Sequence, residues 1–357
     1  METHTVYQDL AQHLDSFPQG YPSTTSGVEL QILAALFSPE EARLSTFLSV
    51  DFISLSDLVK LTGYAKTELI VHLKSMANKG LINLTQKEGE IQVMLLPFIV
   101  GFYENQRERL DKEFAQLVET YFNESGFQLV SITPFFHRVI PVREAVDTKI
   151  EILPENDIAK ILSSKNAWAV IDCICRKQQA LLDRACGHPI RNCLIMSDSA
   201  HAFDGRDDMD ALTFDEALDV LRQAADAGLV HTVANHREGL AYICNCCTCS
   251  CGILRGIAEA RLSNVVARSA YRAVVAEEDC VGCGECETVC QFSAIQVLDT
   301  AEINLDVCVG CGVCVRVCPE GAITLTLRPA EDILAIPNAY HDWLEVRRES
   351  RDVILDE

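Results

Sequence analysis

The sequence predicts an α+β chain of several domains, and three observations support this fold class. The chain has 357 residues, which is too many for one ordinary hydrophobic core. Its N-terminal part combines apolar residues at helical spacing with a hairpin signal. None of its 17 cysteines precedes Cys173, so the composition changes along the chain. We expect five segments, which comprise residues 1–26, 27–103, 104–270, 271–330 and 331–357.

Composition and charge argue against several classes of protein. Hydrophobic residues make up 48% and charged residues 23%, as in a folded chain rather than a disordered one. The net charge of −22 argues against a protein that coats nucleic acid, because such a protein needs a basic face. The longest apolar run, Val93 to Tyr103, is shorter than the roughly 20 residues of a membrane-spanning helix. With no secretory signal visible, we expect a cytoplasmic protein without a membrane span.

The two N-terminal segments are predicted from their turns and caps. Residues 1–26 are polar and interrupted by proline and glycine, so we expect a short arm. In residues 27–103, a capping box at Ser38 to Glu41 opens one helix, and Gly80 ends another. Lys87 to Gly89 mark a hairpin. The order of helix, turn, helix and hairpin resembles a winged helix-turn-helix module.

The charge of this winged-helix-like module favours protein contacts over DNA. Residues 1–100 hold 6 basic and 11 acidic side chains. The second helix of the motif offers Lys66, Lys74 and Lys79 against Glu68, with no arginine, whereas specific readers of DNA present arginine or a dense basic face. We therefore expect docking to a protein or pairing of two copies of the chain, and no nucleic-acid binding.

The middle segment is predicted to be an α/β region that contains cysteines. Phe102 to Glu124 is predicted as one amphipathic helix. Ala169 to Ile174 is a buried-type strand that runs directly into cysteines, and a capping box at Thr213 opens a helix that ends at Gly228. After the last cysteine, Tyr340 to Glu357 is predicted as a polar helix or docking tail.

The strongest signal is an internal repeat of the pattern C-x2-C-x2-C-x3-C. The pattern begins at Cys280 and returns 28 residues later, at Cys308. Three cysteines at intervals of three wrap a loop around one [4Fe-4S] cubane and supply three thiolates, so the fourth must come from elsewhere. Zinc is the alternative occupant, but zinc sites usually take their cysteines from paired C-x2-C motifs and do not need two consecutive runs of four cysteines.

This repeat resembles the bacterial-type ferredoxin with two [4Fe-4S] clusters. The resemblance implies that the fourth cysteine of each run ligates the cluster of the other run. One cluster is then held by Cys280, Cys283, Cys286 and Cys318. The second is held by Cys308, Cys311, Cys314 and Cys290. The second run keeps the usual proline, Pro319, whereas Gln291 stands at the corresponding place in the first.

Nine further cysteines lie between residues 173 and 251 and are too many to be structural. Cys173 ends an apolar strand and fits a buried structural role. The others are candidate ligands of one or two further iron–sulfur clusters, or of one cluster and a zinc ion: Cys175, Cys186, Cys193, Cys244, Cys246, Cys247, Cys249 and Cys251. Arg176 and Arg191 lie beside them and would offset the negative charge of a cluster, or simply be solvated. His188 is more often a solvated loop residue than a ligand.

The whole layout resembles a group of multidomain 4Fe-4S binding proteins of anaerobes, a resemblance that implies cluster binding and no particular reaction. No dinucleotide-binding, P-loop or nucleophile-elbow motif is present. We therefore expect an oxygen-sensitive electron-transfer protein or subunit that exchanges single electrons with a redox protein, such as a larger oxidoreductase. The alternatives are a redox-responsive DNA-binding regulator and a reductase subunit with a substrate at the middle cluster.

Overall fold

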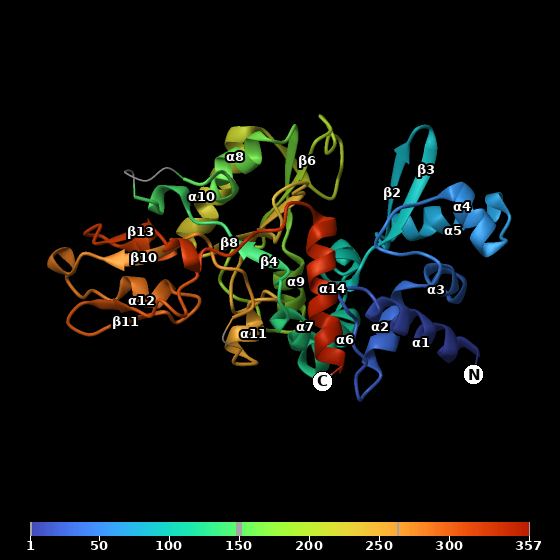
Figure 1. Cartoon of the computed structure of the whole chain (residues 1–357), viewed down its shortest axis with the longest axis horizontal. Coiled ribbons are helices and arrows are strands. Elements are labelled where there is room, and N and C mark those ends of the chain that lie inside the picture. The colour runs from blue at the N-terminus through green and yellow to red at the C-terminus, as the bar shows by residue number, and fades with distance from the viewer. Residues whose placement is uncertain (1, 148–151, 263, 357) are drawn as a thin grey trace. The chain divides into compact units, whose positions relative to one another are not determined.

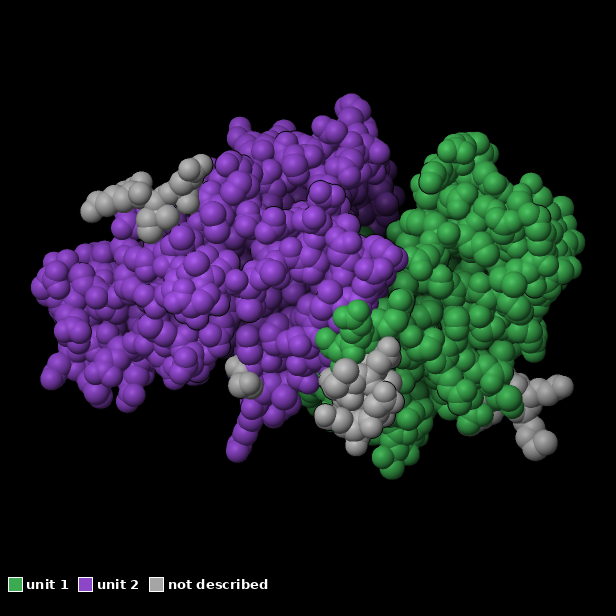
Figure 2. Space-filling model, viewed as in Figure 1, with its two compact units in different colours: residues 1–129, 178–184, 347–357 green, residues 130–177, 185–346 purple. Residues whose placement is uncertain are grey.

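The computed structural model describes residues 2–147, 152–262 and 264–356. The chain divides into two compact units, which are coloured separately in Figure 2. Unit 1 comprises residues 1–129, 178–184 and 347–357, and unit 2 comprises residues 130–177 and 185–346. Residues 271–330, which were expected to form a separate domain, therefore share one unit with most of the cysteine-rich middle region.

Unit 1 begins with three helices, α1 (Glu2–Asp15), α2 (Val28–Leu36) and α3 (Pro39–Ser45). Residues 1–26 thus contain a helix where an arm was expected. The reason is that α1 buries apolar side chains, among them Leu10 and Leu14, which are 0% and 1% exposed. The capping box predicted at Ser38 is confirmed, because Ser38 and Glu41 exchange both of its hydrogen bonds.

The rest of residues 27–103 forms two helices and a small antiparallel sheet. The helices are α4 (Leu55–Thr62) and α5 (Lys66–Asn78). The sheet has the strand order β1-β3-β2, from β1 (Ile53–Ser54), β2 (Ile82–Lys87) and β3 (Glu90–Leu95). The hairpin turn lies at Glu88 and Gly89, whose φ angles of 54° and 81° are the left-handed values of a tight two-residue turn. The expected hairpin is therefore present.

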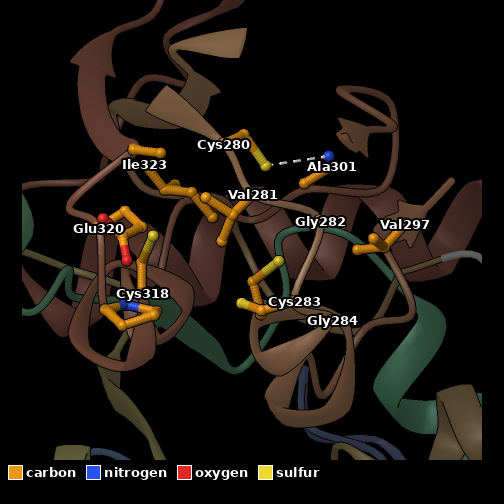
Figure 3. A pocket seen from close by; sticks show the side chains of 13 residues that line it. Cys280, Val281, Gly282, Cys283, Gly284, Val297, Ala301, Cys318, Glu320 and Ile323 are labelled. Atoms are coloured by element: carbon orange, nitrogen blue, oxygen red, sulfur yellow. Dashed lines mark hydrogen bonds between the residues drawn. The ribbon is translucent and has the colours of Figure 1, made fainter. Parts of the chain in front are cut away.

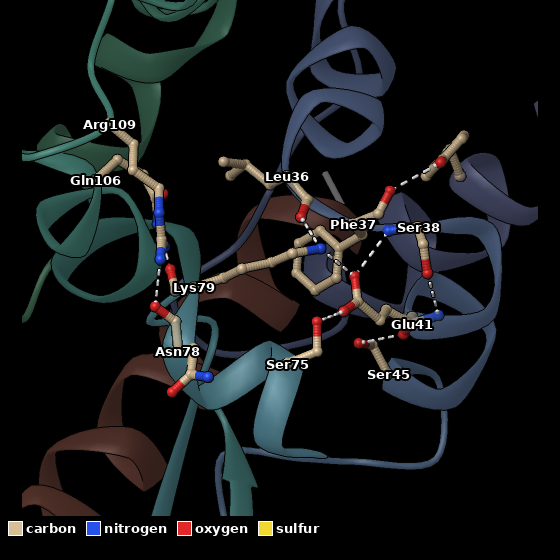
Figure 4. A network of polar contacts seen from close by, with 11 residues as sticks. Leu36, Phe37, Ser38, Glu41, Ser45, Ser75, Asn78, Lys79, Gln106 and Arg109 are labelled. Atoms are coloured by element: carbon tan, nitrogen blue, oxygen red, sulfur yellow. Dashed lines mark hydrogen bonds and ion pairs between the residues drawn. The ribbon is translucent and has the colours of Figure 1, made fainter. Parts of the chain in front are cut away.

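A buried carboxylate joins α3 to the end of α5 (Figure 4). Glu41 is 2% exposed and accepts hydrogen bonds from Ser75 Oγ at 2.6 Å and from Lys79 Nζ at 2.5 Å. Burial alone would raise the pKa of Glu41, but these donors lower it below its ordinary value. Lys79, one of the three lysines considered for DNA contact, is thus engaged inside the module.

The single helix predicted over Phe102 to Glu124 is wrong. An irregular stretch at Phe98–Phe102 and a 3₁₀ turn at Glu104–Gln106 precede helix α6 (Lys112–Tyr121). The helix starts late because the Asp111 side chain accepts a hydrogen bond from the Phe114 N–H at 2.8 Å, which makes Asp111 its N-cap. A wide turn at Phe122–Gly126 and helix α7 (Phe127–Ser131) follow.

Unit 2 contains a six-stranded sheet with the order β4-β8-β9-β6-β5-β7, in which all neighbours are antiparallel. The strands are β4 (His137–Val139), β5 (Ala167–Asp172), β6 (Arg191–Ser197), β7 (Asp210–Leu212), β8 (Val230–Ala234) and β9 (Tyr242–Cys246). The helices of this region are α8 (Ile158–Ser163), the first part of α9 (Ile174–Leu181), α10 (Phe214–Asp226) and α11 (Arg255–Ala258), and residues 178–181 of α9 belong to unit 1. The capping box at Thr213 is confirmed, and Leu221 of α10 packs in the core against sheet residues such as Leu194.

The C-terminal part of unit 2 contains two short strand pairs and two one-turn helices. Strands β10 (Tyr271–Val275) and β13 (Ile323–Leu327) form one pair, and β11 (Ile295–Val297) and β12 (Ala301–Ile303) form another. Each cysteine run ends in a one-turn helix, α12 (Glu285–Val289) or α13 (Val313–Val317). Strands β10, β11 and β13 and helix α12 are labelled in Figure 1. The last helix is α14 (Tyr340–Asp356), as expected from its polar pattern, and its residues from 347 onward belong to unit 1. None of the described helices is both long enough and apolar enough to cross a bilayer.

Candidate metal centres

The eight cysteines of the repeat surround two separate cavities. Cys280, Cys283 and Cys286 line one cavity together with Cys318, beside Glu320 (Figure 3). The other cavity is lined by Cys308, Cys311, Cys314 and Cys290. We call these the first and second cages. Each cage combines three cysteines of one run with the last cysteine of the other, which is the grouping that the resemblance to ferredoxins implies.

Glycines let the loops of the cages approach other backbone segments. Gly310 has a φ of 70°, and a Cβ atom there would lie 2.0 Å from the carbonyl oxygen of Tyr271. Gly282 has a φ of 65°, and its Cβ would lie 2.5 Å from the carbonyl oxygen of Asp299. Only glycine fits these two positions, because both the left-handed conformation and the close contact exclude a side chain.

Backbone N–H groups point at the sulfurs of both cages. The N–H of Ala301 donates to Cys280 Sγ at 3.4 Å, and the N–H of Ala294 donates to Cys290 Sγ at 3.3 Å. Burial raises the pKa of Cys311 to about 12, so this sulfur needs a bound metal to be a thiolate at neutral pH. These features fit an iron–sulfur cluster, whose sulfurs are anionic and are stabilised by such donors.

The cages differ in their exposure to solvent. In the first cage Cys283 is exposed, and the neighbouring Val281 is 65% exposed. In the second cage Cys308 and Cys314 are both buried, each 8% exposed. The first cage therefore has the more exposed cysteine of the two cages.

Six of the nine middle cysteines form a closed ring of neighbouring thiols, in which each side chain shifts the pKa of the next. We call this group the six-thiol ring; in order, its members are Cys173, Cys175, Cys251, Cys246, Cys244 and Cys193. The sulfurs of Cys246 and Cys251 lie 3.5 Å apart. Cys173, which was assigned a structural role, is part of this ring, where it contacts Cys175 and Cys193.

The sheet explains much of the ring. Cys244 and Cys246 lie two apart on β9, so their side chains point to the same face of the sheet. Cys193 lies on β6, beside the pair of Leu194 with Ile243, and Ile171 of β5 pairs with Cys193. The C-x-C spacing of Cys244 and Cys246 is therefore a strand periodicity.

The remaining three middle cysteines form a second group, which we call the thiol triad. The Sγ atoms of Cys186, Cys247 and Cys249 all lie within 4.8 Å of one another. The side chain of Arg176 reaches this group, because its Nη2 donates to Cys247 Sγ at 3.5 Å. His188 does not belong to this group, so the structure does not identify it as a ligand.

The two arginines near the middle cysteines differ. Arg176 is 3% exposed, and hydrogen bonds to Asn192 Oδ1 at 2.8 Å and to the Asn245 carbonyl at 2.7 Å hold it in place. Burial opposes its charge, but the nearby Cys173 and Cys247 raise its pKa above the ordinary value. Arg191 is an exposed partner of the carboxylates of Asp172 and Asp210. Of the two arginines expected to offset the charge of the thiolates, only Arg176 is placed to do so.

The glutamine that replaces proline in the first run links the second cage to the middle cysteines. Gln291 Oε1 accepts hydrogen bonds from the N–H of Thr248 at 2.9 Å and from its hydroxyl at 2.8 Å. Gln291 Nε2 donates to the carbonyl of Gly228 at 3.1 Å. Sequence reasoning missed this role, although the departure from proline was its visible signal.

Comparison with known proteins identifies one part of the chain. Neither the curated proteins nor the solved structures include a match. The family model of the 4Fe-4S dicluster domain matches residues 273–325, which contain both cysteine runs. The C-terminal part of the chain is therefore a ferredoxin-type domain that binds 4Fe-4S clusters.

Proposed function

We propose that the chain passes single electrons between redox partners through two C-terminal [4Fe-4S] clusters and one middle cluster. The observation that carries this proposal is the sharing of cysteines between the two cages. Such sharing ties both clusters into one rigid domain and keeps them close together, which electron transfer needs. The first cluster would have Cys280, Cys283, Cys286 and Cys318 as ligands, and the second Cys308, Cys311, Cys314 and Cys290.

The six-thiol ring is the proposed site of the middle cluster. A [4Fe-4S] cluster needs four thiolates, and the ring offers six in one group. Gln291, which follows a ligand of the second cage, is hydrogen-bonded to Thr248 in the same cysteine-dense segment. Electrons would therefore enter or leave at the exposed first cage and pass through the second cage to the ring.

The surface around the first cage supports docking of a basic redox protein. Val281 and Leu298 expose 65% and 64% of their surface there. Five acidic side chains nearby are exposed: Glu277, Glu278, Asp279, Glu285 and Glu287. An apolar contact with an acidic rim steers a partner of opposite charge and orients it.

A reductive titration of the full chain under anoxic conditions tests the proposal. We expect the visible absorption of the oxidised clusters to bleach as electrons are added, and electron paramagnetic resonance to detect reduced [4Fe-4S] clusters. Cys318→Ser should remove the signal of the first cluster, and Cys290→Ser that of the second. A chain that accepts no electrons from a strong reductant would overturn the proposal.

The N-terminal helices and hairpin are proposed to form a winged-helix-like docking module. This is favoured over a DNA reader because Lys79 is paired with Glu41, which leaves fewer cations for phosphates. An anoxic gel-shift assay should detect no sequence-selective, salt-sensitive DNA complex. Tight selective binding would instead favour the redox-responsive regulator.

A further inference from the structure

The thiol triad has a different geometry from the two cages. A tetrahedral ion with metal–sulfur bonds near 2.3 Å holds its thiolates about 3.8 Å apart, whereas the thiolates of a cubane each bind a different iron and lie farther apart. In the described part of the chain, the triad is the one group of three or more metal-ligating atoms that all lie within 4.8 Å of one another. The eight cysteines around the cages do not form such a group. The triad therefore has a spacing that fits one ion.

The charge around the triad also fits a bound ion. Three thiolates with one divalent cation carry a net charge of −1, which needs a counter-charge when it is buried. Arg176 supplies a cation at 3.5 Å from Cys247, and no described carboxylate forms an ion pair with it. Its Nε is buried and has no hydrogen-bond partner in the described residues. Its other acceptors are neutral carbonyl oxygens, so a thiolate at Cys247 would be its one anionic hydrogen-bond partner among the described residues.

We propose that Cys186, Cys247 and Cys249 bind a single thiophilic divalent ion of the zinc type, separate from the iron–sulfur clusters. Two hydrogen bonds orient Cys186 for this role, from the hydroxyl of Ser250 at 3.3 Å and from the N–H of His188. Such outer contacts fix the orientation of a ligand and tune the metal. The proposal adds a metal centre to the electron-transfer function and does not depend on it.

The ion would keep one position for a small external ligand. Three protein ligands and one open position are the arrangement of catalytic rather than structural zinc sites. Cys249 is exposed, so the site is reached from solvent. Water, hydroxide or a small thiol are the ligands that this position would take.

Metal analysis of the full chain tests the proposal. The chain is isolated without oxygen from cells supplied with iron and zinc, and both metals are measured by mass spectrometry. We expect about one zinc ion per chain, in addition to iron. Cys249→Ser should lower the zinc content at least tenfold and leave the iron content unchanged. The matched variant Cys244→Ser, in the six-thiol ring, should lose iron and keep zinc.

Binding of cobalt provides a second measurement, which does not depend on the metal that the chain acquires in the cell. A Co²⁺-substituted chain should show sulfur-to-cobalt charge-transfer absorption that Cys249→Ser abolishes, and a small thiol should shift it. The proposal is overturned if the wild-type chain holds no zinc and takes up no cobalt, or if Cys249→Ser loses iron. Because Cys249 is exposed, its substitution by serine should leave the fold intact, which circular dichroism would check.

Discussion

The carbonyl oxygen of the Gln291 side chain accepts two hydrogen bonds from Thr248, from the N–H at 2.9 Å and from the hydroxyl at 2.8 Å. Gln291 directly follows Cys290 of the second cage, and Thr248 lies between Cys247 and Cys249 of the thiol triad. One side chain thus connects a proposed ligand of an iron–sulfur cluster to the segment that carries the thiol triad, the proposed zinc-type site. Proline could not make these contacts, because it has no polar side chain.

Removing this side chain should loosen the cysteine-dense segment without removing a ligand. For Gln291→Ala we expect the N–H of Thr248 to exchange with deuterium about three- to tenfold faster, the size of one lost hydrogen bond. Gln291→Glu is the matched control, because its carboxylate can still accept from Thr248. Iron content should stay the same in both. Equal exchange rates in Gln291→Ala and the wild type would contradict the assigned role.

Alanine at Gly310 should disrupt the second cage. We expect a cost of about 2–6 kcal/mol, since the substitution combines a left-handed backbone with a clash against the Tyr271 carbonyl. Iron content should fall by about four ions per chain, one cluster. Gly284→Ala is the control: Gly284 also has a positive φ, of 81°, but its Cβ would meet nothing within 4 Å. If both variants keep all their iron, the close approach of Gly310 to the Tyr271 carbonyl is not needed for cluster binding.

Neutralising Arg176 should weaken the thiol triad. For Arg176→Met we expect the affinity of the triad for Co²⁺ to fall about 10- to 100-fold, as is usual when a group beside the ligands is lost. Arg176→Lys should recover part of this affinity through its charge. Arg191→Met should change it little, because Arg191 is paired with Asp172 and Asp210 at the surface. Similar effects of Arg176→Met and Arg191→Met would show that Arg176 has no special role.

The buried carboxylate of Glu41 should stabilise unit 1 in a pH-dependent way. Its pKa is lowered in the folded chain, so its stabilisation is complete above its unfolded pKa, near 4.3, and is lost as the pH falls through the folded pKa. Glu41→Gln should therefore cost about 1–2 kcal/mol at pH 7 and progressively less below about pH 4.

Hydrogen exchange in α3 and α5 measures this effect locally, apart from the metal centres of unit 2. Asp57→Asn is the control, because Asp57 and Lys60 form an ion pair in which both side chains are exposed and contribute little. If Glu41→Gln loses the same amount of protection at pH 7 as below about pH 4, the ion pair of Glu41 with Lys79 is not the cause of the loss.

Signals that depend on neighbours in the sequence were predicted well. Both capping boxes and the hairpin are present, because each arises from hydrogen bonds within a few residues. The ferredoxin-type domain was also predicted, because its repeated cysteine spacing is itself a local pattern.

Features that depend on distant partners were not predictable. The contact of Cys175 with Cys251 joins residues far apart in the sequence, and only the strand order brings them together. Cys173 follows an apolar strand and therefore reads as structural, although it belongs to the six-thiol ring. The helix from Phe102 failed for a local reason: Asp111 caps a later start and outweighs the apolar stripe.

The most direct measurement is the count of iron, acid-labile sulfide and zinc in the full chain isolated without oxygen. We predict about twelve iron and twelve sulfide ions, from two C-terminal clusters and one in the six-thiol ring, together with about one zinc ion. About eight iron ions would confine the clusters to the C-terminal domain. A chain without labile sulfide would contradict the proposed electron-transfer function.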